Sequence, residues 1–476
     1  MFIQKVAIKN LRLFGDGFSL DESNIAVPDG SNEGSGLTIL VGENGVGKST
    51  ILDAISYSLI SYKAESLTLN DFSDIKAEVE VSVEANEEFT VKRTMSGQFQ
   101  SSGFKFLAKV RTQNSTKYPV GTIVSDTFFV PAVADSVKEG SPDLRVAVNN
   151  PFAGPRFSDN DYVFIDKNRI KALESGTYST TRFDRLLDNF NFQYLKANDK
   201  EPLALHDVLD SAINTGDEHI SNELLEQAFN YFEQVTGYKV RLNLIDNTLP
   251  YKNAFLGFED MQQTQIPIER IGSGYQMFLA LICQHKLSLQ SGKELVMLID
   301  EVELNLHPRL QRTLVDLLLE ISKDSQIILT SHSPELLKDL RKNKYHKVNA
   351  VVKSGSDISI NPIKEFVLPS PTVSETNYVA FGLASMEYFI ELYNQFSENS
   401  NCDSIAATDR ALGIPDGELI DWERENGSIQ RLSVYSCIRN KFHHPNNTRN
   451  DRKFRIDYEA VEQATVFLRG KIANED

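Results

Sequence analysis

The sequence predicts an α/β protein built around a parallel sheet, with helices inserted in the middle of the chain and added at its end. Three observations support this fold class. An apolar run at 37–41 leads into a glycine-rich loop and then a helical pattern. A second apolar run at 295–299 ends in two carboxylates, and a third at 327–330 ends beside a histidine. Buried parallel strands give such runs, and their carboxyl ends are where ligands bind.

Length and composition limit the classes of protein. A chain of 476 residues is long enough for two or three domains, and a hydrophobic content of 41% is ample for a buried core. The 49 basic and 66 acidic residues give a net charge of −17, which excludes broad binding of nucleic acid by the whole surface. The basic clusters at 341–347 and 449–455 remain candidates for local nucleic-acid binding, with a solvated charged face as the alternative.

The cysteines and the hydropathy pattern indicate the compartment. Cys283, Cys402 and Cys437 are widely spaced and form no C-x-x-C pair. This pattern favours a reducing, cytoplasmic location and argues against a zinc site. No run of about 18 apolar residues occurs, so we expect no transmembrane helix and no membrane partner.

The periodicity of the apolar residues divides the chain into four parts. Residues 1–175 contain the glycine-rich loop and a β-rich lobe, with an edge strand at 2–8 and a hairpin of 76–85 and 87–95 that turns at Asn86. Residues 176–236 read as amphipathic helices. Strands return in 237–365, at 238–244 and 254–258. Residues 366–476 are predicted to be mostly helical.

The loop VGENGVGKST fits the phosphate-loop pattern G-x-x-x-x-G-K-[ST] between a strand and a helix. The candidate nucleotide-binding residues are Gly42, Asn44, Gly45, Gly47, Lys48, Ser49 and Thr50. Glycines leave backbone N–H groups free to wrap phosphates, and the helix N-terminus adds its positive dipole end. Lys48 can reach the β- and γ-phosphates, and Ser49 can ligate Mg²⁺. The alternative is a purely structural glycine turn.

Two carboxylates follow the strand ELVMLI. Asp300 is expected to hold Mg²⁺ through water, and Glu301 is placed to polarise the attacking water. The alternative is a buried strand with an acidic cap. These two acids therefore acquire a catalytic interpretation mainly from the phosphate loop that precedes them.

Two further segments complete the candidate site. Ser273, Gly274 and Gln276 begin an apolar helix, where Ser273 can act as N-cap and present its hydroxyl to an anion. His332 directly follows a strand and could contact the γ-phosphate. A simple helix cap and a structural histidine are the respective alternatives. Arg12, after the first strand, is also a nucleotide-binding candidate.

In order and spacing, these motifs resemble those of ABC/SMC-type ATPases. The resemblance covers about 1–57 and 270–352 and implies an ATPase head with a mixed sheet and a parallel phosphate-loop sheet. It also implies a homodimer with two ATP molecules sandwiched, in which Ser273 and Gly274 of one subunit face the phosphate loop, Asp300, Glu301 and His332 of the other. Two departures are Tyr275, where transporters usually have Gly, and a Q-loop glutamine that we do not assign.

Other segments narrow the resemblance. LNLHP at 304–308 is similar to the OLD-type and defence-type branch. The segments at 374–396 and 437–450 resemble the tails of bacterial antiphage ATPases, most of all the PtuA family of Septu systems, also found beside some retrons. That family works with an HNH nuclease. The ATPases of PARIS systems, whose partner is a TOPRIM-type nuclease, are the competing resemblance.

The segment RNKFHH also fits the R-x-x-x-x-H motif of HEPN ribonucleases, through Arg439, Asn440, His443 and His444. The His could serve as acid or base and the Arg could stabilise charge on phosphorus. The alternative is a structural or partner-docking role, since Pro445 would end the helix there.

The sequence therefore predicts an ATP- and Mg²⁺-dependent ATPase that regulates a separate nuclease in an antiphage complex, as a dimer or higher homo-oligomer of heads. A DNA-repair ATPase of the RecF or SMC kind and an ATP-gated HEPN ribonuclease are the alternatives.

Overall fold

In the computed structural model the chain forms two compact units, Met1–Pro362 and Ile363–Asp476. The structure describes residues 1–59, 67–93, 97–113, 119–131, 160–165, 223–244, 254–259, 265–267, 272–291, 294–304, 306–340, 343–355, 357–363, 366–370, 372–450 and 456–473. Of the predicted helical insertion at 176–236, only the last helix falls within these residues.

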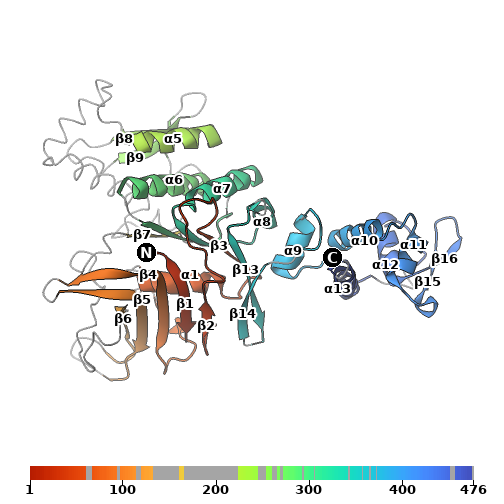
Figure 1. The fold of residues 1–476 in the computed structure, drawn as a ribbon, viewed down its shortest axis with the longest axis horizontal. Helices are drawn as coiled ribbons and strands as arrows, with labels where there is room; N and C mark the ends of the chain where they lie inside the picture. Colours follow the sequence, from red (N-terminus) through yellow and green to blue (C-terminus); the bar gives the residue numbers. More distant parts are fainter. Residues whose placement is uncertain are drawn as a thin grey trace. The chain divides into compact units, whose positions relative to one another are not determined.

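The N-terminal unit mixes strands and helices in the order expected of an α/β protein (Figure 1). Its elements are β1 (Ile3–Lys9), β2 (Phe18–Leu20), β3 (Leu37–Val41), α1 (Lys48–Leu59), β4 (Val79–Arg93), β5 (Gly97–Val110), β6 (Ile123–Pro131), β7 (Asn160–Ile165), α5 (Glu223–Thr236), β8 (Lys239–Leu244), β9 (Ala254–Glu259), β10 (Gln265–Pro267), α6 (Ser273–Ser291), β11 (Glu294–Ile299), α7 (Pro308–Ile321), β12 (Gln326–Thr330), α8 (Pro334–Leu340), β13 (Lys347–Ser354) and β14 (Asp357–Pro362).

A six-stranded sheet in the order β14-β13-β3-β12-β11-β7 forms the centre of this unit. All neighbouring pairs are parallel except β13 with β14. Every residue of β3 and β12 is buried, which explains their continuous apolar sequences. Because β3, β12 and β11 are adjacent and parallel, the phosphate loop, the residues after β12 and the two acids after β11 meet at one edge. The predicted phosphate-loop sheet is confirmed.

A second, antiparallel sheet in the order β2-β1-β4-β5-β6 makes the fold mixed, as predicted. Two details of the prediction were wrong. The first strand is not an edge strand, because β1 pairs with both β2 and β4. Asn86 does not turn a hairpin but lies inside the single strand β4, where the register against β5 shifts between Glu84 and Phe89. Its side chain accepts the N–H of Phe2 at 2.6 Å, and its own N–H donates to the Phe2 carbonyl at 2.8 Å. The asparagine therefore stabilises an irregular strand pairing instead of a turn.

Helix α1 is buried on nearly all sides, because ten of its twelve residues lack solvent exposure. Ile51, Leu52 and Ile55 belong to one core cluster with strand residues of both sheets. In Figure 1 the antiparallel sheet lies on the opposite side of the central sheet from α6, α7 and α8. Burying each of the three large side chains contributes about 1.5–3 kcal/mol, so the start of the helix is rigidly held beside the loop.

The C-terminal unit contains α9 (Val373–Phe381), α10 (Met386–Asn399), α11 (Ile405–Leu412), β15 (Ile420–Glu423), β16 (Ile429–Leu432), α12 (Val434–His443) and α13 (Tyr458–Ala473). Helices α9, α10, α11 and α12 each begin after a Ser or Thr whose side chain accepts a backbone N–H. Gly382 and Gly413 end α9 and α11 at φ of 70° and 71°. The region is mostly helical, as predicted, but the β15–β16 hairpin was missed.

This unit has a core of its own. Tyr388, Phe389 and Leu392 of α10 pack in one cluster with Ile438 of α12 and Leu468 of α13. A buried carboxylate joins two further helices: Asp409 of α11 accepts bonds from the N–H and the hydroxyl of Ser433 and from the hydroxyl of Ser436. Among the described helices of the chain, none is long and apolar enough to cross a membrane.

Candidate functional site

The phosphate loop has the backbone conformations that its glycines allow. Gly42, Gly45 and Gly47 have φ of 140°, 78° and 104°, in a region that side chains rarely adopt. A Cβ on Gly42 would lie 2.4 Å from the carbonyl oxygen of Val351, and one on Gly47 would lie 2.9 Å from the ring of Phe14. Asn44 and Gly45 form the exposed tip of the loop. Gly42 and Gly47 are therefore required for the close approach of the loop to its surroundings, and all three glycines allow its curvature.

Lys48 is the first residue of α1 and is 5% exposed. Its ammonium donates to the carbonyls of Gly42 at 2.8 Å and Glu43 at 2.6 Å, so it lies within the curve of the loop. Burial lowers the pKa of Lys48 to about 8, although the carboxylates of Asp300, Glu301 and Glu303 favour the charged form. A buried cation at a helix N-terminus is a site that attracts an anion of several charges, such as a triphosphate.

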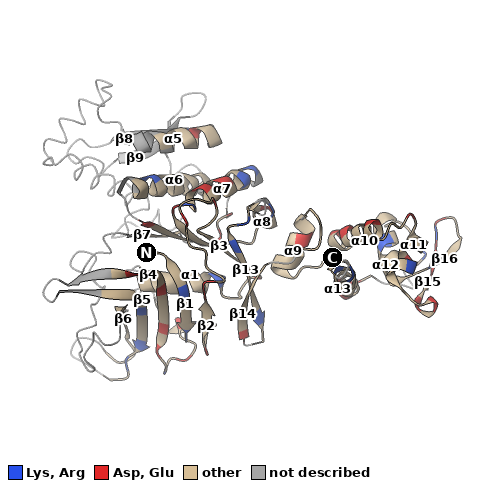
Figure 2. Cartoon of the chain, viewed as in Figure 1, with Lys and Arg blue, Asp and Glu red and all other residues tan. Residues whose placement is uncertain are grey.

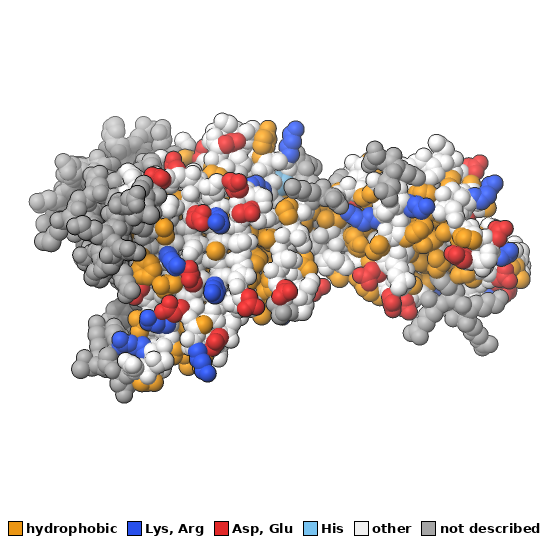
Figure 3. All heavy atoms as spheres, turned by 60° about the horizontal axis from the view of Figure 1, so that its bottom comes forward, with side chains coloured by type: hydrophobic (Ala, Val, Ile, Leu, Met, Phe, Trp, Pro, Cys, Tyr) orange, Lys and Arg blue, Asp and Glu red, His pale blue; other side chains and the backbone are white. Residues whose placement is uncertain are grey.

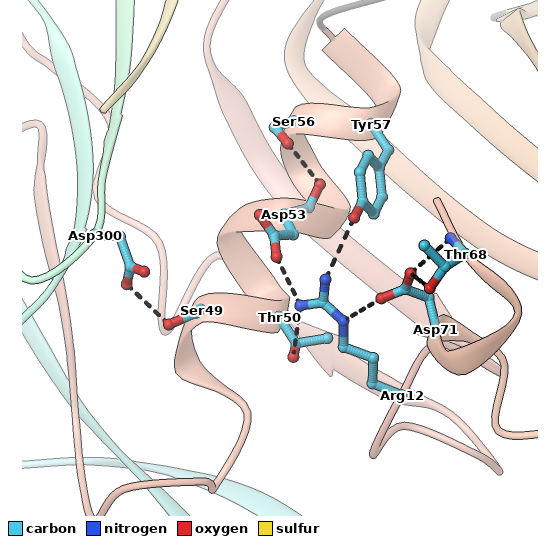
Figure 4. Close-up of polar contacts among 9 residues, drawn as sticks. All are labelled: Arg12, Ser49, Thr50, Asp53, Ser56, Tyr57, Thr68, Asp71 and Asp300. Atoms are coloured by element: carbon cyan, nitrogen blue, oxygen red, sulfur yellow. Dashed lines mark hydrogen bonds and ion pairs between the residues drawn. The ribbon is translucent and has the colours of Figure 1, made fainter. Parts of the chain in front are cut away.

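Ser49 and Asp300 lie against each other although 251 positions separate them in the sequence (Figure 4). The Ser49 hydroxyl donates to Oδ1 of Asp300 at 3.0 Å, and the same oxygen accepts the hydroxyl of Thr330 at 2.6 Å. A hydroxyl and a carboxylate are oxygen ligands of the kind that Mg²⁺ prefers. The pair predicted to hold the metal is therefore brought together by the segments that follow β3 and β11, on either side of β12.

Glu301 adopts a backbone conformation that is rare for a residue with a side chain, at φ of 48°. Its N–H donates to the hydroxyl of Thr330 at 2.8 Å, and the N–H of Val302 donates to the Thr330 carbonyl at 3.2 Å. Thr330 is fully buried. One threonine thus fixes both acids, and sequence analysis missed it because a Thr at a strand end carries no distinctive pattern.

His332 follows β12 and is partly buried. Burial and the charge of Lys48 lower the pKa of its imidazole, while Glu303, Glu301 and Asp300 act in the opposite direction. The structure thus brings His332 into the electrostatic surroundings of Lys48 and the acids. Its backbone N–H donates to Oε1 of Glu303 at 2.5 Å. Glu303 is a second residue that sequence analysis missed, since its position two residues after the acid pair looked like an ordinary turn carboxylate.

Arg12 is surrounded by acceptors instead of pointing to open space (Figure 4). Its guanidinium donates to Asp71 at 2.7 Å and Asp53 at 2.6 Å, with longer contacts to Thr50 at 3.4 Å and Tyr57 at 3.5 Å. Burial alone would lower the pKa of Arg12, but its hydrogen bonds and the two carboxylates raise it. Arg12 therefore lies beside the loop helix, held there by side chains of α1 and by Asp71 at the end of the short 3-10 helix Leu69–Asp71.

The predicted signature segment begins α6, with Ser273 as the first helical residue and Gly274 and Gln276 buried. The carbonyl of Gly272 accepts the first helical hydrogen bonds, from Tyr275 and Gln276. The prediction of Ser273 as the N-cap was therefore wrong by one position, because Gly272 takes that place.

The C-terminal motif residues converge on a cavity of about 360 Å³ within the second unit. Arg439, Asn440 and His444 line it together with Trp422 and Glu425. Arg439 donates to the side chain of Asn440 at 3.1 Å, and the imidazole of His444 is 3.9 Å from the carboxylate of Glu425. Helix α12 ends at His443, before Pro445, as predicted. Burial, Arg439 and His444 lower the pKa of His443, whose exposed ring packs on the edge of Phe442.

The predicted basic clusters are partly used inside the fold. The ammonium of Lys347 donates to the carbonyls of Glu22 and Ile25, and Arg449 pairs with Glu423 at 2.8 Å. Arg341, Arg452 and the rest of 451–455 lie outside the described residues. Figures 2 and 3 show acidic and basic residues mixed over the coloured parts of both units.

Comparison with known proteins places the central part of the chain in a family. Residues 37–338 match the family described as "AAA domain, putative AbiEii toxin, Type IV TA system". The chain belongs to this AAA-domain family. The match spans β3, the phosphate loop, α6, the acids after β11 and the residues after β12, which are the parts that form the candidate site. The predicted ABC/SMC-like ATPase class is confirmed at this level.

The individual proteins that are similar to this chain share only a small part of its sequence. The OLD nuclease of Thermus scotoductus is 24% identical over 445 residues, covering 86% of this chain and 76% of that protein. Among solved structures, an Smc head bound to the C-terminal winged-helix domain of ScpA has a TM-score of 0.48 at 17% identity, over 76% of this chain and 97% of that one. An SMC head from Thermotoga maritima has a TM-score of 0.37 at 14% identity, over 77% of this chain and 100% of that one.

Proposed function

We propose that this chain binds and hydrolyses ATP with Mg²⁺, and that it acts in the cytoplasm as the regulatory subunit of a bacterial antiphage complex. The observation that carries the ATPase proposal is the direct link from Ser49 through Asp300 to Thr330. It places the end of the phosphate-loop strand, the acid pair and the strand before His332 in one site. Membership of an AAA-domain family supports the same activity.

The residues fit ATP and Mg²⁺. Lys48 and the N–H groups of Gly45 and Gly47 would hold the phosphates, while Ser49 and Asp300 would hold the metal, which neutralises charge on the phosphates when bound. Glu301 would accept a proton from the attacking water as the water oxygen forms a bond to the γ-phosphorus. The bond between that phosphorus and the ADP oxygen breaks, giving ADP and phosphate. His332 is placed to contact the γ-phosphate.

Two substitutions test this activity. Glu301→Gln keeps the size of the side chain but removes the base, so it should bind ATP and hydrolyse it at least 100-fold more slowly. Lys48→Ala should weaken nucleotide binding itself. Equal ATP turnover by Glu301→Gln and the unchanged protein would refute the assignment of Glu301.

We further propose that ATP joins two heads, with Ser273, Gly274 and Gln276 of one subunit completing the site of the other. The sequence motif at the start of α6 supports this, since its helix N-terminus can bind an anion. Glu301→Gln should dimerise in ATP and dissociate when the nucleotide is removed. Light scattering after size-exclusion chromatography measures this, and a monomer in saturating ATP would contradict the proposal.

The complex that we propose contains a separate nuclease, of HNH type as with the PtuA family or of TOPRIM type in the competing case. The similarity to a protein named OLD nuclease supports a link to nuclease systems. Co-expression with the product of the neighbouring gene tests the partnership. If no partner co-purifies and the protein alone cuts nucleic acid, the regulatory role is lost.

A ribonuclease in the C-terminal unit is the second candidate, because Arg439, Asn440 and His444 line one cavity. That arrangement would place a cation and an acid or base beside a phosphodiester. Arg439→Ala and His444→Ala should then both abolish RNA cleavage and toxicity, while replacement of an exposed acid of α10 outside the cavity, Glu398→Ala, should not. Unchanged cleavage in the first two variants would exclude this activity.

A further inference from the structure

Glu303, in the turn after β11, binds a backbone N–H of another loop. Its Oε1 accepts the N–H of His332 at 2.5 Å, across 29 positions of sequence. Val302, the residue before Glu303, is joined to the same loop through the Thr330 carbonyl. Two neighbouring residues after β11 are therefore attached to two residues at the end of β12.

The second oxygen of Glu303 has no hydrogen-bond partner among the described residues, and it is buried. A buried carboxylate oxygen without a partner is unfavourable, and native proteins contain few of them. A glutamine would supply the same acceptor to His332. The hydrogen bond of Glu303 and its charge can therefore be separated by substitution.

The position of Glu303 indicates what its hydrogen bond to His332 does. Glu303 acts electrostatically on both Lys48 and His332, so it lies within reach of the groups that surround the phosphates. The loop that it holds begins at Ser331, and His332 is the only residue of that loop whose side chain is predicted to meet the γ-phosphate. A displacement of the His332 backbone would therefore displace its imidazole by a similar distance.

We propose that Glu303 is a positioning residue, which fixes the His332 backbone relative to Glu301 and so sets where the imidazole meets the γ-phosphate. This rests on the proposed ATPase function. Glu303 would act through His332 and not by contact with the nucleotide. Its removal should therefore lower kcat and leave the affinity for ATP nearly unchanged, because the phosphates are held chiefly by the loop and Lys48.

Three substitutions separate the hydrogen bond from the charge. Glu303→Ala removes both, and kcat should fall about tenfold or more. Glu303→Asp keeps the charge but is one methylene too short to reach the His332 N–H, so it should resemble the alanine variant. Glu303→Gln keeps the acceptor without the charge, so it should stay within about threefold of the unchanged protein. Glu335→Ala, which removes an exposed acid three residues after His332, is the matched control.

Amide hydrogen exchange gives a second measurement that needs no activity. The His332 N–H should exchange faster in Glu303→Ala and Glu303→Asp and stay protected in Glu303→Gln and Glu335→Ala. If the alanine variant does not fold, the Asp and Gln variants carry the same comparison. Fluorescent-nucleotide titration should give similar ATP affinity throughout.

The outcomes distinguish the two levels of the proposal. If the unchanged protein hydrolyses no ATP, the proposed function fails, and the exchange data still decide whether Glu303 holds the loop. If the unchanged protein is active and Glu303→Asp matches it in kcat and exchange, the positioning role is refuted. The positioning role is also refuted if Glu303→Gln and Glu303→Ala lose the same factor in kcat while the His332 N–H exchanges as in the unchanged protein. The charge of Glu303, and not its hydrogen bond, would then account for the lost activity.

Discussion

Replacing Thr330 with valine offers the sharpest test of how the acid pair is held. Valine has nearly the same shape but no hydroxyl, so the change removes two hydrogen bonds without creating a cavity. The lost bonds are the 2.6 Å bond to the Asp300 carboxylate and the 2.8 Å bond from the Glu301 N–H. Thr330 is fully buried, so water cannot replace them. Together they are worth about 2–4 kcal/mol.

The effect of Thr330→Val on kcat and its effect on the requirement for Mg²⁺ can be measured separately. If the free energy of both hydrogen bonds is lost from the stabilisation of the transition state, kcat should fall between about 30-fold and 1,000-fold. This follows because about 1.4 kcal/mol corresponds to a factor of ten in rate. The concentration of Mg²⁺ needed for half-maximal turnover should rise, because Asp300 loses the donor that orients it. Steady-state phosphate release at saturating ATP, with Mg²⁺ varied, gives both values.

Thr330→Ser is the matched control. It keeps the hydroxyl and loses one methyl group, at a cost of about 1 kcal/mol in stability. It should therefore unfold at slightly lower urea concentration and retain most of its turnover. A valine variant that is as active as the serine variant would refute the argument that this hydroxyl positions the acids.

The remaining predictions concern the loop and its neighbours. Burial lowers the pKa of Lys48 to about 8, so its charged form declines as the pH rises through 8. ATP affinity should therefore fall about 25-fold between pH 7.5 and pH 9.5, and titrations of Lys48→Ala should show no such step. Gly42→Ala should abolish nucleotide binding and lower the melting temperature, because its Cβ would overlap a carbonyl oxygen, whereas Gly45→Ala meets no atom within 4 Å and should cost only about 1–2 kcal/mol in urea unfolding for its left-handed φ. Arg12→Ala should lower the free energy of unfolding by about 1–3 kcal/mol, with Arg12→Lys intermediate because lysine cannot bridge two carboxylates as a planar fork; equal stability of all three proteins would contradict this.

The parts of the fold that the sequence predicted well have short-range signals. The strand at 37–41, the loop and α1 follow one another within about twenty residues, and the apolar runs before Asp300 and His332 are continuous. Because parallel strands place their carboxyl ends together, these local signals also indicated a common site. The order of the strands in the sheet was not predicted, since pairing between distant strands leaves no local trace.

The errors have particular physical causes. Asn86 is a residue typical of turns, but here its amide group bonds to the backbone of Phe2 and permits an irregular strand. The β15–β16 hairpin was missed because its strands have four residues each and are mostly polar on the exposed side. Thr330 and Glu303 act through backbone N–H groups of distant residues, so their roles follow from the fold and not from a motif.

The glutamine at the start of β12 has a wider consequence. Gln326 is fully buried, and its side chain accepts the N–H of Ile3 at 2.7 Å and donates to the carbonyls of Ile3 at 2.7 Å and Ala26 at 2.9 Å. The Gln326 side chain thus pairs with both backbone polar groups of Ile3, the first residue of β1, in the way that a neighbouring strand pairs with a residue. The other end of β12 is Thr330, about 13 Å away along an extended chain. Strand β12 therefore carries, at one end, a side chain bonded to the antiparallel sheet and, at the other, the hydroxyl bonded to the acid pair. We expect a displacement of β1 to be transmitted to the acids along this strand.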